Sequence, residues 1–225
     1  MGLLVIISIL LVLYGPYGWA RYVLNRYGRE EYFSGDGFEL ARLLLERQNL
    51  SAVRLEETPA GDHYDPEKKV IRLSRARCGR RSLTAVVVAA HEVGHAIQDQ
   101  QAYRPLRTRA RLVAMAARAE KMGAIIMMAV PVMALVTRLP ATGWLIFLGG
   151  LATLCIPLLV HLFTLPTEFD ASYRRALPAL EDGPLIPPED FPAARRILTA
   201  CALTYVAGAL VGLLNVWRWI RVLRR

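Results

Sequence analysis

The sequence predicts a mainly α-helical membrane protein with about four transmembrane helices and a small α+β region on one side of the bilayer. Hydrophobic residues make up 54% of the 225 residues, and the mean hydropathy is +0.30, both of which are high for a soluble fold. Four stretches lack charged side chains over lengths near the roughly 20 residues that a membrane-spanning helix needs. These stretches are residues 2–20, 122–137, 139–167 and 197–217.

The apolar stretches divide the chain into membrane-spanning and polar segments. We expect transmembrane helices over residues 2–21 and 197–217, and between them a transmembrane hairpin over 122–163 with helices at 122–137 and 141–163. The first helix has no Lys or Arg ahead of its apolar core, which favours an uncleaved anchor over a cleaved signal peptide. The helix that follows Lys121 is short, so a re-entrant or buried core helix is its alternative.

Basic residues outnumber acidic ones, 28 to 19, which gives a net charge of +9. Because the arginines flank the apolar stretches, we attribute them to membrane topology and contact with anionic lipid headgroups, not to nucleic acid. More of them flank residues 22–121 and 164–196 than the opposite ends, which predicts that these segments share the cytoplasmic side. The basic C-terminal tail favours the reverse orientation. Cys78, Cys155 and Cys201 are scattered and indicate no disulfide framework.

Residues 34–121 combine helix and strand patterns. Asp36 can cap a short amphipathic helix over 38–48. Residues 51–57 and 68–74 alternate in residue type, and a polar link with Pro and Gly joins them. We therefore expect a two-stranded antiparallel element.

A metal-binding motif lies on the next predicted helix, over residues 83–98, for which Ser82 is the N-cap. This helix contains the pentad HEVGH, in which His91 and His95 lie one turn apart on the same face. Both imidazoles can reach one cation, and Glu92 projects beside them toward a metal-bound water. The pattern is typical of hydrolytic zinc sites.

A catalytic zinc usually has three protein ligands, so one more must come from elsewhere in the sequence. The candidates are His63, His161, Glu120, Glu168 and Asp170. Glu168 is favoured because it lies early in a predicted helix over 164–180, just after the hairpin returns the chain to the side that it left. The helix and a polar loop over 181–192 make up the segment 164–196.

Five separated motifs carry a family resemblance. They are DHYDP (62–66), VIRLS (70–74), AAHEVGHAIQ (89–98), TLPTEFDAS (164–172) and LTYVA (203–207). In this order they resemble the YugP-like neutral zinc metallopeptidases of bacterial membranes, which are similar to the integral-membrane gluzincins. The resemblance covers nearly the whole chain. It implies a zincin-like catalytic region over 34–121 that is completed by the helix in 164–196.

The resemblance also assigns roles residue by residue. It implies His91, His95 and Glu168 as the ligands of one catalytic Zn²⁺ ion. Glu92 is then the general base, which takes a proton from water that the metal has made more acidic. The gluzincin pattern places an Asp four residues after the Glu ligand, whereas this chain has Ser172 there.

Two supporting roles stay open at this point. The candidates for orienting a zinc-bound imidazole are Asp170, Ser172 and Asp65. The candidates for stabilising the transition state are His63, Tyr64, Tyr103 and Tyr173. The predicted strand over 68–74 could also offer an edge to an extended peptide.

These observations predict a membrane-embedded zinc metalloendopeptidase that hydrolyses peptide bonds of membrane or membrane-proximal proteins. It would be a multi-pass protein of the bacterial cell membrane, with the lipid bilayer and a polypeptide substrate as partners, no nucleic acid, and the site on the cytoplasmic side. One alternative is a non-proteolytic zinc-binding membrane scaffold, which would have no need of Glu92. Another is a different zinc-dependent amidohydrolase using the same activated water.

Overall fold

The computed structural model describes residues 2–29, 33–137, 140–182 and 185–214. These residues form two compact units. The first, here the hairpin unit, contains the described residues of 1–14, 107–164 and 205–225. The second, here the site unit, contains those of 15–106 and 165–204.

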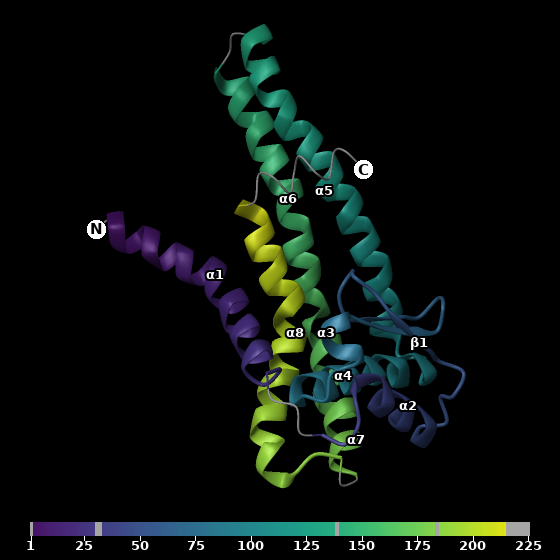
Figure 1. The fold of residues 1–225 in the computed structure, drawn as a ribbon. Coiled ribbons are helices and arrows are strands. Elements are labelled where there is room, and N and C mark those ends of the chain that lie inside the picture. Colours follow the sequence, from purple (N-terminus) through teal and green to yellow (C-terminus); the bar gives the residue numbers. More distant parts are fainter. Residues whose placement is uncertain (1, 30–32, 138–139, 183–184, 215–225) are drawn as a thin grey trace. The chain divides into compact units, whose positions relative to one another are not determined.

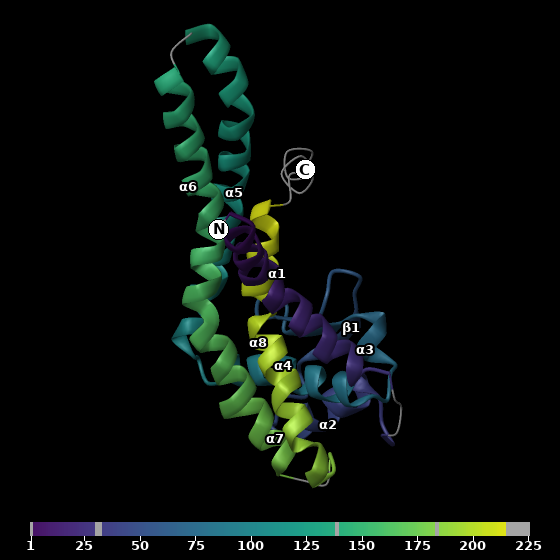
Figure 2. The ribbon, with the colours of Figure 1, turned by 90° about the vertical axis from the view of Figure 1, so that its left-hand side faces the viewer.

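Helices make up most of both units (Figures 1 and 2). They are α1 (Gly2–Arg26), α2 (Gly37–Arg47), α3 (Arg75–Cys78), α4 (Leu83–Gln100), α5 (Arg104–Thr137), α6 (Pro140–Phe169), the π-helical η1 (Asp170–Ala176), α7 (Leu177–Glu181), the 3-10 helix η2 (Pro188–Asp190) and α8 (Phe191–Leu214). The strands are β1 (Arg54–Glu57), β2 (His63–Asp65) and β3 (Val70–Leu73). Within the hairpin unit, α5 and α6 run side by side in opposite directions in both views.

The prediction of about four transmembrane helices is wrong. Across the described part of the chain, the structure contains no helix that combines the length and the apolar character needed to cross a bilayer. The prediction was based on uncharged stretches, and the structure places two of them in helices that also contain charged segments. The stretch 122–137 is the second half of α5, whose first half carries arginines such as Arg107 and Arg111. The stretch from residue 197 belongs to α8, which also contains Arg195, and its residues 215–217 lie outside the described part.

Helix α2 begins at an N-terminal cap formed by Asp36. The Asp36 side chain accepts a hydrogen bond from the Glu39 backbone N–H, and the Glu39 side chain accepts one from the Asp36 N–H, both at 2.9 Å. This capping box satisfies two N–H groups that the helix itself cannot. The buried face of α2 includes Leu40, Leu44 and Leu45, and it contacts α4. The predicted cap at Asp36 is therefore confirmed.

The sheet differs from the predicted antiparallel pair. It has three strands in the order β1-β3-β2, in which β1 and β3 are parallel while β2 and β3 are antiparallel. The prediction was wrong because the polar link contains β2, which reverses the chain before the tight turn into β3. Asp65 makes that turn, since its Oδ1 accepts from the backbone N–H groups of Glu67 and Lys68, both at 3.1 Å.

Helix α4 forms the centre of the site unit. Every residue from Leu83 to Gln98 is buried, and the helix contacts α2, α3, the strands β2 and β3, and η1. Ser82 caps it by accepting from the Ala85 N–H at 3.3 Å, as the sequence predicts. Over residues 83–98 the helix can present polar side chains only to partners inside the protein, so the pentad lies in a site shielded from bulk water.

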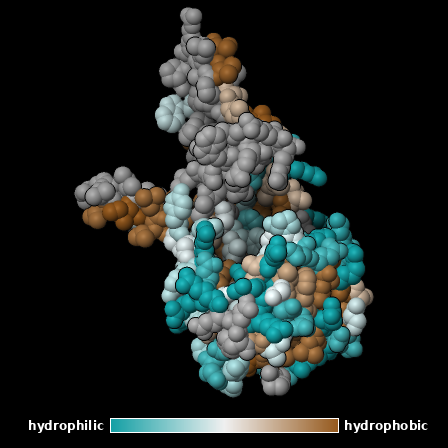
Figure 3. Space-filling model, in the orientation of Figure 1, coloured by the Kyte–Doolittle hydropathy of each residue, from teal (hydrophilic) through white to brown (hydrophobic). Residues whose placement is uncertain are grey.

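The surface of α1 contrasts with this enclosed core. Figure 3 shows hydrophobic surface along this helix. Its exposed residues include Leu4, Leu11 and Val12, each at least 65% exposed. Charged and apolar residues mix on the face of the site unit visible in the same view.

Candidate metal centre

Three buried side chains bring their ligand atoms together inside the site unit. His91 Nε2 and His95 Nε2 each lie 3.3 Å from Glu168 Oε2. The side chains of both histidines are 4% exposed and that of Glu168 is 1% exposed. Among the residues that the structure describes, this is the one group of His, Cys, Asp and Glu found with metal-binding spacing, and its ligand atoms all lie within 4.8 Å of one another.

A close backbone contact allows α4 to approach the segment that carries Glu168. A Cβ atom at Gly94 would lie 2.5 Å from the carbonyl oxygen of Ala171 in η1. Such a distance is far below van der Waals contact, so glycine is needed at this point of the pentad. The wider turn of the π helix begins at Asp170, two residues after Glu168, and π-helical turns often accompany functional sites.

The hydrogen bond of His91 determines which of its ring nitrogens is available. Its Nδ1 lies 3.0 Å from Ser172 Oγ, and Ser172 Oγ donates its own hydrogen to the carbonyl oxygen of Leu198 at 3.2 Å. Because the hydroxyl has a single hydrogen, it must accept from His91 Nδ1–H. The lone pair of His91 is therefore on Nε2, which faces Glu168.

His95 is fixed in the same tautomer by an amide. Its Nδ1 lies 3.0 Å from Oε1 of Gln98, which can only accept. The Gln98 Nε2 donates to the carbonyl oxygen of Thr167 at 2.9 Å, and this bond sets the orientation of the amide. Both imidazoles thus direct an Nε2 lone pair at the Glu168 carboxylate.

This donor set fits a zinc ion. Zinc ligands lie about 2.0–2.1 Å from the metal, and two such atoms at the tetrahedral angle are about 3.3 Å apart. The two Nε2–Oε2 distances to Glu168 have this value. Without a cation, lone pairs would face one another in a buried space, which is unfavourable. His91, His95 and Glu168 would hold the ion and leave its fourth position open.

Glu92 is also buried, with 4% of its surface exposed, and it follows His91 directly in α4. Its carboxylate lies in the neighbourhood of Cys201 of α8. Burial raises the pKa of the Cys201 thiol, and the negative charge of Glu92 raises it further. Cys201 is therefore a protonated thiol beside the site, not a thiolate ligand.

The structure separates the three candidates for orienting an imidazole. Ser172 contacts His91 directly, whereas Asp170 contacts neither histidine and accepts from Gln98 Nε2 at 2.8 Å. Asp65 pairs with Arg72 at 3.0 Å and with backbone N–H groups of its own turn. Burial opposes ionisation of Asp65, but the hydrogen bonds from Lys68, Arg72 and Glu67 outweigh it and lower the pKa.

The transition-state candidates on β2 point to opposite faces of the sheet. Tyr64 donates to Asp99 Oδ2 at 2.7 Å, near the C-terminal end of α4. Burial, followed by this contact with Asp99, raises the pKa of Tyr64. His63 Nδ1 lies 2.9 Å from the carbonyl oxygen of Gly61, and its Nε2 lies 3.4 Å from Arg72. The contacts of both side chains are thus made within the strand region and with the end of α4.

The remaining candidates also have other contacts. The Tyr173 hydroxyl lies 2.6 Å from Thr199 Oγ1, and the Tyr103 ring lies 5.9 Å from the Arg175 guanidinium carbon. His161 and Glu120, considered as third ligands, belong to the hairpin unit and are not members of the three-residue cluster.

Gln98 is the site residue that the sequence argument missed. A signal was available, because Gln98 is a polar residue about one turn beyond His95 and follows the apolar pair Ala96 and Ile97 in a buried helix. It is 0% exposed, and a polar side chain buried at that position must have hydrogen-bond partners.

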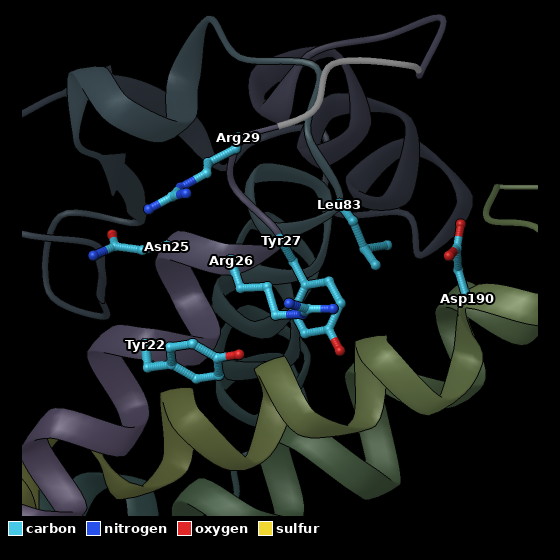
Figure 4. Close-up of a pocket in the computed structure, with 7 residues that line it drawn as sticks. All are labelled: Tyr22, Asn25, Arg26, Tyr27, Arg29, Leu83 and Asp190. Atoms are coloured by element: carbon cyan, nitrogen blue, oxygen red, sulfur yellow. The ribbon is translucent and has the colours of Figure 1, made fainter.

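A separate cavity of about 470 Å³ lies where α1 ends (Figure 4). Its lining includes Tyr22, Arg26 and Arg29, together with Leu83 at the start of α4 and Asp190. The three residues of the metal cluster are not part of this lining.

Comparison with known proteins gives two matches. A family model described as "Putative neutral zinc metallopeptidase" matches residues 2–224. The chain is also 32% identical over 212 residues to the "Putative membrane protease YugP" of Bacillus subtilis (strain 168), and this alignment covers 91% of the chain and 90% of the relative. No solved structure matches the chain.

Proposed function

Because the chain belongs to the neutral zinc metallopeptidase family, we propose that it is a zinc metalloendopeptidase that hydrolyses peptide bonds with Glu92 as the general base. The observation that carries the proposal is the convergence of His91 Nε2 and His95 Nε2 on Glu168 Oε2, each at 3.3 Å, next to a buried Glu92. The name of the Bacillus subtilis relative, a membrane protease, supports membrane-associated polypeptides as the substrate class. The expectation of a cytoplasmic site relied on arginines that flank membrane spans, and the described helices supply no such span.

The chain's own residues divide the chemical work. A zinc ion held by His91, His95 and Glu168 would polarise the scissile carbonyl and make water more acidic. Glu92 accepts the proton of the attacking water and then delivers it to the nitrogen of the leaving amine, which balances the hydrolysis. Burial of the cluster keeps bulk water away, so the charges act on the substrate with little screening.

The predicted peptide-binding role of the strand over 68–74 needs correction. β3 is the central strand, with β1 on one side and β2 on the other, so it has no open edge. We propose the outer edge of β2 instead, because β2 is an edge strand that contacts α4. A peptide paired there would lie in an extended conformation beside the metal helix.

Replacing Glu92 with Gln tests the proposed reaction. Glu92→Gln keeps the size of the side chain and removes the base, so peptide cleavage should fall by roughly 10²- to 10⁴-fold. Zinc content should stay at the wild-type level, because Glu92 is not one of the three ligands. The measurement is cleavage of membrane proteins, compared between membranes containing the wild type and those containing Glu92→Gln.

Fragments that appear only with the wild type support the proposal. Equal cleavage by the purified wild type and Glu92→Gln would exclude Glu92 as the base. If both proteins bind zinc and neither releases fragments, the scaffold alternative is favoured.

A further inference from the structure

We propose that Gln98, held in place by Asp170 and Arg175, is a positioning residue that orients His95 for metal binding. This inference rests on the proposed zinc site. It adds that the carboxylate serving the second histidine is Asp170, which acts through an amide and not by direct contact.

Gln98 uses its hydrogen-bonding groups fully in a buried setting. Oε1 accepts from His95 Nδ1–H at 3.0 Å. Nε2 donates to Asp170 Oδ2 at 2.8 Å and to the Thr167 carbonyl at 2.9 Å. With 0% of the residue exposed, water cannot replace these bonds. The amide therefore links α4 to the end of α6 and to the start of η1.

Asp170 is in turn held by a cation. Arg175 Nε donates to Asp170 Oδ2 at 3.2 Å, and Arg175 Nη1 donates to Gln101 Oε1 in the turn after α4. The Asp170 side chain is 6% exposed and that of Arg175 is 19% exposed. These hydrogen bonds thus connect the partly exposed Arg175, through Asp170 and Gln98, to His95.

The direction of these hydrogen bonds determines how Asp170 affects His95. A carboxylate that accepts from Gln98 Nε2 draws electron density toward the amide oxygen and makes Oε1 a better acceptor. A better acceptor for His95 Nδ1–H makes the opposite nitrogen, Nε2, a stronger metal ligand. Asp170 thereby affects the metal site although it does not touch the imidazole.

This arrangement accounts for the serine at position 172. In the gluzincin pattern a carboxylate stands four residues after the Glu ligand, where this chain has a hydroxyl bonded to His91. Here a carboxylate stands two residues after Glu168, at Asp170, and it serves His95 through Gln98. A carboxylate therefore supports a histidine here as well, but that histidine is His95 and not His91.

Zinc affinity of the purified metal-free protein, measured by competition with a chelator, tests the inference without using peptidase activity. Gln98→Met keeps the length of the side chain and removes its polar bonds, so the zinc dissociation constant should rise by about 10- to 100-fold. The absorption spectrum of the Co²⁺-loaded protein should also change. Gln100→Met is the matched control, because Gln100 is exposed on the same helix and bonds to the Gln48 carbonyl at 3.4 Å.

A polarity swap separates positioning from folding. Gln98→Glu alone places two carboxylates against each other and should weaken zinc binding. Adding Asp170→Asn supplies an amide that can donate to the new carboxylate, whose other oxygen can still accept from His95. The double variant should recover part of the affinity, and not all of it, because the Thr167 carbonyl stays without its donor.

The outcomes separate this inference from the proposed function. A wild-type protein that binds no zinc would contradict the proposed function. Tight zinc binding by both the wild type and Gln98→Met would contradict the inference alone. If thermal unfolding shows that Gln98→Met does not fold, the comparison of Gln98→Glu with the double variant takes its place. A double variant that binds zinc no more tightly than Gln98→Glu overturns the inference.

Discussion

The two histidines of the candidate metal centre lie at the same distance from Glu168 and differ in the residues that orient them. His91 is oriented by the neutral hydroxyl of Ser172, which donates its own hydrogen bond to the backbone carbonyl of Leu198. His95 is oriented by Gln98, which leads to the charged pair formed by Asp170 and Arg175. Equal distances to the shared carboxylate therefore hide unequal electrostatic support, and substitutions on the two sides should have unequal effects.

Ser172→Ala tests the neutral side of this comparison. It leaves the Nδ1–H of His91 without its partner, which costs roughly 1–3 kcal/mol for a buried group. We expect a lower melting temperature and a rise in the zinc dissociation constant of about tenfold, the low end of the range for such contacts. A loss of affinity larger than that of Gln98→Met would reverse the order of the two supports.

Tyr64→Phe is expected to have the smallest effect, because Tyr64 contacts Asp99 beyond the metal-binding turns of α4. Zinc affinity should stay unchanged, while the free energy of unfolding falls by about 1 kcal/mol for the lost hydrogen bond. The folded state raises the pKa of Tyr64 above its usual 10.0, so its contribution to stability is present below pH 10 and is lost as the pH rises. Tyr64→Phe should remove that part of the alkaline destabilisation, measured by urea unfolding at pH 8 and 11. A changed zinc affinity would show that residues of β2 also help to orient the two histidines.

The part of the site that could be predicted from the sequence is the part set by local geometry. His91, Glu92 and His95 lie within two turns of one helix, so their spacing alone indicates a metal site. Glu168 needed the hairpin argument and the family resemblance, because it is distant in the chain. The bond from His91 through Ser172 to Leu198 depends on the packing of η1 against α4 and on a third segment, and no spacing rule gives it.

Two predictions failed for identifiable physical reasons. The strands β1 and β3 were expected to be antiparallel, but the short strand β2 in the polar link adds a second reversal, which makes them parallel. The four transmembrane helices were inferred from uncharged stretches, and the structure places two of those stretches in helices that also carry arginines. In both cases the prediction used a local sequence pattern, whereas the structure depended on the neighbouring segments of the chain.

The central claim is that His91, His95 and Glu168 together hold one zinc ion, and the zinc content of purified protein tests it most directly. Glu168→Gln keeps the size of the side chain and removes the charged ligand from the pair of histidines. The account predicts one zinc ion per chain in the wild type after dialysis and close to none in Glu168→Gln, with both proteins folded by circular dichroism. Equal zinc content in the two proteins would contradict it.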